Sequence, residues 1–123
     1  MKMQHAVVWT DHHKAQVLQF DAEHVLAQKI KTHTHHTRQH GSAVRTEHEF
    51  FADLCDALKG IEEVLVTGPR TALADFRHYL EKHRPEVGKR VVGTEPVDHP
   101  SDGQLVAFAR QYFAKYDLMQ GKR

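Results

Sequence analysis

Three short apolar segments within the first thirty residues limit most strongly what this chain can fold into. Each is rich in valine, leucine or aromatic residues, which favour extended strands. Only short polar connections separate them, and connections of that length suit antiparallel hairpins. The pattern therefore predicts an antiparallel start, with strands at His5–Thr10, Ala15–Phe20 and His24–Ile30.

Later in the chain the apolar residues recur at helical spacing. Thr46, followed three residues later by Glu49, has the capping-box pattern and predicts the start of a helix that ends at about Gly60. A second helix is expected at about residues 71–83. The third begins after Ser101, where another capping box precedes the strongest amphipathic pattern of the sequence.

Two further strands are expected between these helices, at Glu63–Thr67 and at Arg90–Gly93. The order is then three strands, a loop, and an alternation of helix, strand, helix, strand and helix (βββ-loop-αβαβα). Hairpin strands followed by helical crossovers imply an α/β fold, with a mixed sheet of about five strands and helices packed on it. Ribonuclease H-like folds have this order. A chain of 123 residues suits a single domain, which we assign to residues 1–123.

The segment KIKTHTHHTRQHGSAVR, residues 29–45, predicts a loop at about residues 31–45 because it has no helical or alternating apolar pattern. It holds four histidines, two lysines, two arginines and no carboxylate, although the whole chain has a formal net charge of only +1. Such residues bind phosphate and ribose, and histidine can also stack on unpaired bases. The same composition also fits a plain solvated surface loop. We expect an RNA-binding loop with no catalytic role. Its candidate contact residues are Lys31, His33, His35, His36, Arg38, Gln39, His40, Gly41, Ser42 and Arg45.

A metal site is a second hypothesis for the same loop. His33 and His35 would share one face of an extended segment, and His40 would approach as a third ligand. The single cysteine, Cys55, excludes a cysteine-based zinc site and an intrachain disulfide, and its helical position predicts a core residue. Because the histidine spacing matches no defined metal motif, we expect no bound cofactor.

A nuclease is a third hypothesis, and it rests on Asp11. This residue ends the first predicted strand, where ribonuclease H-like enzymes carry a metal-binding carboxylate. Cleavage with two metal ions needs several converging carboxylates, and Gly68 stands where the next one would be required. We therefore interpret Asp11 as a turn residue that caps its own backbone.

The order of elements, the polar loop and the segment EEVLVTGPRTALADFRHYLEKH (residues 62–83) together resemble a known family. They are similar to the central domain of the class I peptide-release factors of eukaryotes and archaea, and to that of the ribosome-rescue protein Pelota. The resemblance covers roughly residues 4–117. It extends to small bacterial release-factor-like proteins described as translational machinery proteins.

In the release factors the equivalent loop carries Gly-Gly-Gln, which helps water attack the ester of peptidyl-tRNA. This chain instead reads Arg38-Gln39-His40-Gly41-Ser42, without the tripeptide and without the backbone freedom of two adjacent glycines. The loop of Pelota also lacks the tripeptide and is basic. The resemblance therefore implies the ribosome or tRNA as the partner. It leaves peptidyl-tRNA hydrolysis through Gln39 as an alternative, while codon recognition and GTPase recruitment belong to other domains of the family.

The start of the sequence, MKMQHAVVW, contains no apolar run long enough for a signal peptide, and no segment approaches the length of a membrane span. We therefore expect a cytoplasmic protein that does not contact a membrane.

Overall fold

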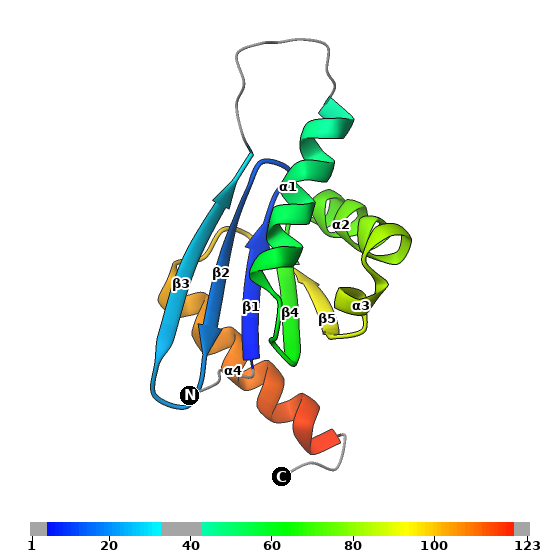
Figure 1. The fold of residues 1–123 in the computed structure, drawn as a ribbon. Coiled ribbons are helices and arrows are strands. Elements are labelled where there is room, and N and C mark those ends of the chain that lie inside the picture. Colours follow the sequence, from blue (N-terminus) through cyan, green and yellow to red (C-terminus); the bar gives the residue numbers. More distant parts are fainter. Residues whose placement is uncertain (1–4, 33–42, 120–123) are drawn as a thin grey trace.

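The computed structural model describes residues 5–32 and 43–119, and for residues 43–45 it describes the backbone alone (Figure 1). The elements in chain order are β1 (His5–Thr10), β2 (Lys14–Phe20), β3 (Val25–Lys31), α1 (Ala43–Ala57), β4 (Glu63–Gly68), α2 (Arg70–His83), α3 (Pro85–Gly88), β5 (Val91–Pro96) and α4 (Asp102–Met119). The predicted order is confirmed, with α3 as one additional short helix.

The five strands form one mixed sheet in the order β3-β2-β1-β4-β5. The first three strands pair antiparallel, while β1, β4 and β5 run parallel to one another. Both hairpin turns are closed by an aspartate. A carboxylate oxygen of Asp11 accepts the backbone N–H groups of His13 and Lys14, each at 2.8 Å. Asp21 does the same for Glu23 at 2.9 Å and His24 at 2.7 Å, so the predicted hairpins and the predicted role of Asp11 are confirmed.

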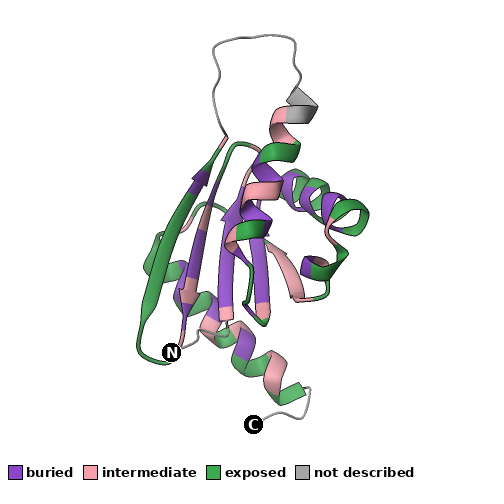
Figure 2. Cartoon of the chain, viewed as in Figure 1, coloured by how far each residue is buried: buried purple, intermediate pink, exposed green. Residues whose placement is uncertain are grey.

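Helices cover both faces of the sheet, with α1 and α2 on one face and α4 on the other (Figures 1 and 2). Because successive strand residues point to opposite faces, neighbouring residues of β1 enter different cores. Val8 packs in the cluster that contains Phe50, Leu54 and Phe76. Val7 packs in the cluster formed with α4. The central strands β1 and β4 are buried on both faces, which gives their nearly continuous apolar sequence.

The predicted boundaries of β5, of the first helix and of the loop are wrong. β5 extends to Pro96, three residues beyond the predicted Gly93. The first helix begins at Ala43, three residues before Thr46, so Thr46 lies inside α1 and is not its cap. The predicted loop at residues 31–45 is correspondingly too long, because Lys31 is the last residue of β3 and Arg45 is already in α1. In contrast, the capping box at Ser101 is confirmed, since its backbone N–H donates to the side chain of Gln104 at 3.0 Å and the reciprocal bond measures 3.2 Å.

The carboxyl ends of β1 and β4 approach each other closely at Gly68. This glycine has φ of 144°, and a Cβ at its position would collide with the backbone oxygen of Thr10. One residue earlier, the buried hydroxyl of Thr67 donates to the backbone oxygen of Val8 at 2.7 Å. No side chain fits at this position. The carboxylate that a nuclease would need there is therefore replaced by glycine.

Candidate nucleic-acid interface

Lys31 is the predicted contact residue whose side chain the structure describes, and it is exposed at the end of β3. For Arg45 the structure describes the backbone, which is helical. The remaining predicted residues lie outside the described ranges 5–32 and 43–119: His33, His35, His36, Arg38, Gln39, His40, Gly41 and Ser42.

The pairing register places Lys31 beside two other lysines. Lys31 lies directly opposite Lys14 of β2, and Lys29 lies opposite Gln16. Opposite residues of an antiparallel pair, and residues two apart on one strand, have their side chains on the same face. The three ammonium groups of Lys14, Lys29 and Lys31 thus share the face of the hairpin that α4 covers farther along, and we call them the lysine triad.

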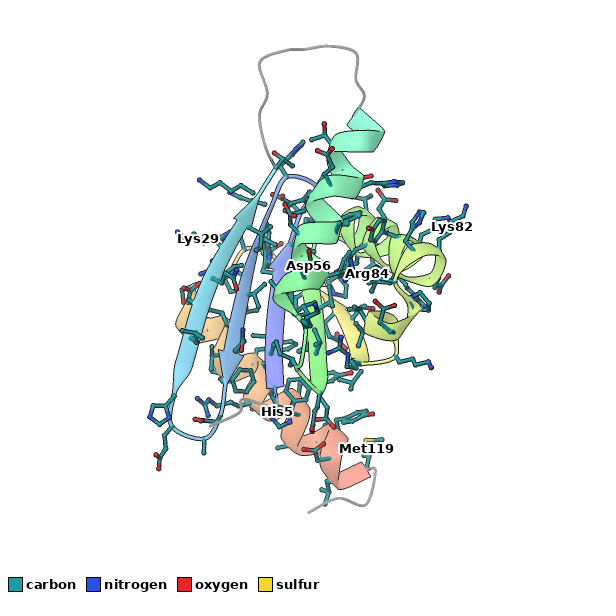
Figure 3. The ribbon with its side chains drawn as sticks, in the orientation of Figure 1. His5, Lys29, Asp56, Lys82, Arg84 and Met119 are labelled. Carbon is teal, nitrogen blue, oxygen red and sulfur yellow. The ribbon has the colours of Figure 1, made fainter. Side chains whose placement is uncertain are left out.

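No described residue forms an ion pair with any lysine of the triad. Like charges directly opposite each other in a sheet are unfavourable, so the Lys14–Lys31 pair costs stability unless an anion is present. Arg84 shows the contrasting arrangement, because its guanidinium donates to Asp56 at 3.1 Å and to Glu86 at 3.0 Å. Figure 3 shows Arg84 and Asp56 close together, with Lys29 on the distant edge strand.

The lysine triad lines a pocket of about 370 Å³ between the hairpin and the segment that enters α4. The floor includes Trp9, whose indole N–H donates to the backbone oxygen of Asp98 at 3.2 Å. The exposed ring of His99 packs edge-on against the buried Trp9, with 4.2 Å between ring centroids. An exposed aromatic ring is therefore held in place next to three cationic groups, a combination that suits a phosphate with an adjoining base or ribose.

The charged groups described in this pocket are mainly cationic. The amide of Gln16 donates to a carboxylate oxygen of Asp102 at 2.8 Å, and Asp102 is the one carboxylate among the lining residues. Against it stand three lysines, so the local charge is positive at neutral pH. Among the described residues 5–32 and 43–119, those that line the pocket include no serine, threonine or cysteine.

The predicted contact residues did not include Trp9, Lys14, Gln16 or His99 of this pocket. The hairpin register could have found Lys14 and Gln16, because a turn closed by Asp11 fixes which residues of β2 face those of β3. Nothing local identifies His99, which reaches Trp9 from a segment ninety positions later in the chain.

Two other candidate residues are structural. Asp11 is engaged by the two backbone N–H groups of its own turn and belongs to no group of three metal-binding side chains in the described part of the chain. Cys55 is completely buried in the core between the sheet and α1, and this burial raises the pKa of its thiol to about 12. Because the thiolate is the reactive form, Cys55 is inert near neutral pH and its predicted core position is confirmed.

The fold is that of a release-factor central domain: a mixed five-stranded sheet, helices on both faces, and a long connection between β3 and α1. Three solved structures show the likeness. Archaeoglobus fulgidus Pelota matches with a TM-score of 0.64 and 16% identity over 90% of this chain and 32% of its own. The archaeal translation termination factor aRF1 matches with a TM-score of 0.52 and 15% identity, over 95% of this chain and 41% of its own. Saccharomyces cerevisiae Dom34 matches with a TM-score of 0.54 and 12% identity, over 85% of this chain and 31% of its own.

The predicted resemblance in fold is thereby confirmed. The chain spans about a third to two fifths of the length of these proteins. No family model matches the sequence, and no curated protein matches it. Among the helices that the structure describes, none is both long enough and apolar enough to cross a membrane.

Proposed function

We propose that this protein acts in translation as a cytoplasmic, non-catalytic RNA-binding protein whose partner is the ribosome or tRNA. The observation that carries the proposal is the lysine triad in its pocket, three cations that no described residue neutralises, beside the supported ring of His99. RNA phosphates supply the missing negative charge, and an unpaired base supplies a surface for the imidazole.

The pocket and the predicted RNA-binding loop are continuous. β3 passes from Lys29 and Lys31 directly into the loop, and the backbone N–H of Thr32 donates to the backbone oxygen of His13 at 2.9 Å. The start of the loop is thus tied to the first hairpin turn. In the proposal the lysine triad binds the phosphate backbone at a fixed place, and the contacts farther along come from His33, His35, His36, Arg38, Gln39, His40, Gly41, Ser42 and Arg45.

The structural neighbours support the choice of partner. One is a translation termination factor, and another is described as a translation termination-like factor involved in RNA quality control pathways. The fold is shared, and the basic side chains lie at the end of the domain where the chain leaves β3. A role on the ribosome follows as the proposal that accounts for both the fold and the unneutralised lysines.

Co-sedimentation with ribosomes at low and moderate salt tests this function. The decisive variant replaces Lys14, Lys29 and Lys31 with glutamine, which removes the charge and keeps the polar stems. The matched control replaces three exposed lysines elsewhere, Lys59, Lys82 and Lys89, with glutamine. Both variants lose three positive charges. A difference in pelleting between them therefore depends on where the charges lie and not on how many are lost.

We expect salt-sensitive pelleting of the wild type, retained by the control and weakened about ten- to hundredfold in the triad variant. A chain with residues 33–40 replaced by a Gly/Ser linker measures the share of the loop. Equal pelleting of the triad variant and its control would reject the pocket as the interface. Absence of pelleting by the wild type at either salt concentration would reject the ribosome as the partner.

A further inference from the structure

We infer that His12, Glu47 and Asp75 form a binding site for a divalent transition-metal ion, with Zn²⁺ as the best-fitting ion. These residues come from three elements that are far apart in sequence: the β1–β2 turn, the start of α1, and α2. His12 is close in sequence to Lys14, but the site shares no residue with the lysine triad. It therefore does not depend on the proposed RNA-binding function.

The distances suit metal coordination. Nε2 of His12 lies 2.9 Å from a carboxylate oxygen of Asp75 and 3.8 Å from one of Glu47. All three potential ligand atoms lie within 4.8 Å of one another. Tetrahedral zinc, with bonds of about 2.0–2.2 Å, separates neighbouring ligand atoms by roughly 3.3–3.6 Å. The observed distances lie on both sides of that separation, so small side-chain rotations bring the three atoms to coordinating positions.

The local charge also favours a cation. Two carboxylates approach a single imidazole nitrogen, and no lysine or arginine of the described chain forms an ion pair with Glu47 or Asp75. The side chains of His12 and Glu47 are 33% and 27% exposed and that of Asp75 is 55% exposed, so water screens the charge of Glu47 less than that of Asp75. A divalent ion neutralises both carboxylates at once.

The donor types restrict the ion. One imidazole and two carboxylates fit zinc and its transition-metal neighbours, while Mg²⁺ and Ca²⁺ prefer ligands that are all oxygen. Three protein ligands leave a fourth position for water or for another side chain. His48 and His78 line the adjoining pocket of about 310 Å³, together with Glu47 and Asp75. Zinc is therefore the first ion to test.

A bound ion would join the two sides of the loop. His12 precedes His13, whose backbone oxygen accepts the N–H of Thr32 at the exit from β3. Glu47 belongs to α1, which follows the loop. Zinc at this site therefore links the turn that holds the start of the loop to the helix that receives its end, and we expect metal binding to stabilise the fold against unfolding.

A second cluster of similar geometry provides a comparison. His5 lies 3.0 Å from a carboxylate oxygen of Glu63 and 3.9 Å from one of Asp117, at the opposite end of the sheet. Glu63 makes a further interaction. His5 serves as a control, because zinc bound at this second cluster would be lost from His5→Gln and kept by His12→Gln.

The experiment is equilibrium dialysis of the untagged, full-length protein against Zn²⁺, with bound metal measured by mass spectrometry. The decisive variants are His12→Gln and Asp75→Asn, and Asp75→Asn keeps the shape of the side chain. The matched controls are His13→Gln, at an exposed neighbouring histidine outside the cluster, and His5→Gln. A chain with residues 33–40 replaced by a Gly/Ser linker separates this site from the loop histidines, and unfolding midpoints without metal show that each variant is folded.

We expect the wild type, both controls and the linker chain to bind zinc at this site, and both decisive variants to lose one equivalent or to bind it at least about tenfold more weakly. Substituted Co²⁺ should give the absorption of a four-coordinate ion in the wild type and lose it in His12→Gln. Unchanged zinc content in His12→Gln, or zinc that disappears only from the linker chain, would overturn the inference. Absence of zinc from the wild type would identify the cluster as an ordinary ion pair. None of these readouts involves RNA, so their failure leaves the lysine pocket untouched.

Discussion

The two faces of the sheet carry opposite charge at the end where the loop leaves it. On the face of α4, the lysine triad surrounds a pocket with a single carboxylate. On the face of α1 and α2, two carboxylates surround His12. The hairpin of β1 and β2 contributes to both, since His12 and Lys14 are separated by one residue. An overall charge of +1 therefore conceals two local clusters of opposite charge.

The largest expected effect comes from a substitution in the central strands, which support the clusters on both faces of the sheet. Gly68→Ala places a Cβ against the backbone oxygen of Thr10 and forces alanine into a backbone conformation that favours glycine. We expect a loss of roughly 3 kcal/mol or more in the free energy of unfolding, measured by urea denaturation. Gly103→Ala is the control, because nothing lies within 4 Å of a Cβ there and alanine favours the helix. A Gly68→Ala protein as stable as wild type would contradict the close approach of β1 and β4.

The next largest effect concerns the salt dependence of RNA binding by the lysine triad. Removing the charges of Lys14, Lys29 and Lys31 together should reduce the slope of log affinity against log salt by about 2–3, since each phosphate contact contributes about 0.7–0.9. The slope is measured by titrating ribosomes or tRNA at several salt concentrations. A weaker affinity with an unchanged slope would mean that the lysines act by shaping the hairpin.

A smaller effect compares the two hairpin turns. Asp11→Ala removes the acceptor for the backbone N–H groups of His13 and Lys14, and should cost about 1 kcal/mol in the free energy of unfolding. Because the same turn positions Lys14, RNA affinity should fall as well. Asp21→Ala opens the corresponding turn at the other end of β2, away from the pocket, and should leave RNA affinity unchanged. Equal RNA affinity of Asp11→Ala and Asp21→Ala would show that the first turn does not position the RNA-binding residues.

The smallest expected effect is a gain in stability. Lys14→Gln relieves the repulsion from Lys31 directly opposite, and should raise the free energy of unfolding in low salt by a few tenths of a kcal/mol. The gain should shrink as salt screens the charges. Thermal unfolding at two salt concentrations measures it, with Lys59→Gln as the control. A loss of stability in Lys14→Gln would show that the triad is neutralised within the protein.

What could be predicted from the sequence was local. The hairpins follow from short connections closed by Asp11 and Asp21, and the start of α4 follows from the reciprocal bonds of Ser101 and Gln104. The Thr46 pattern was misleading, because the helix extends three residues before it. A capping-box sequence can cap a helix that starts there, but it does not prevent the helix from beginning earlier.

The candidate sites depend on distant contacts, and for that reason most of their residues could not be predicted. Lys31 was predicted as a contact residue because it belongs to a segment of unusual composition, whereas His99 lies against Trp9 from a distant part of the sequence. His12 meets Asp75 from sixty-three positions away along the chain. Such pairs are defined by the packing of α2 and α4 on opposite faces of the sheet, and no periodicity in the sequence records them.

Among the described strands, β3 pairs with β2 alone, and it exposes Val25 and Leu26. Its outer backbone groups therefore offer a template for the addition of another strand. Natural proteins often place lysines on an edge strand to prevent such addition. Two copies brought together would place ammonium groups next to each other. Lys29 and Lys31 are therefore placed to oppose self-association at this edge, and substitutions that remove their charges should increase aggregation.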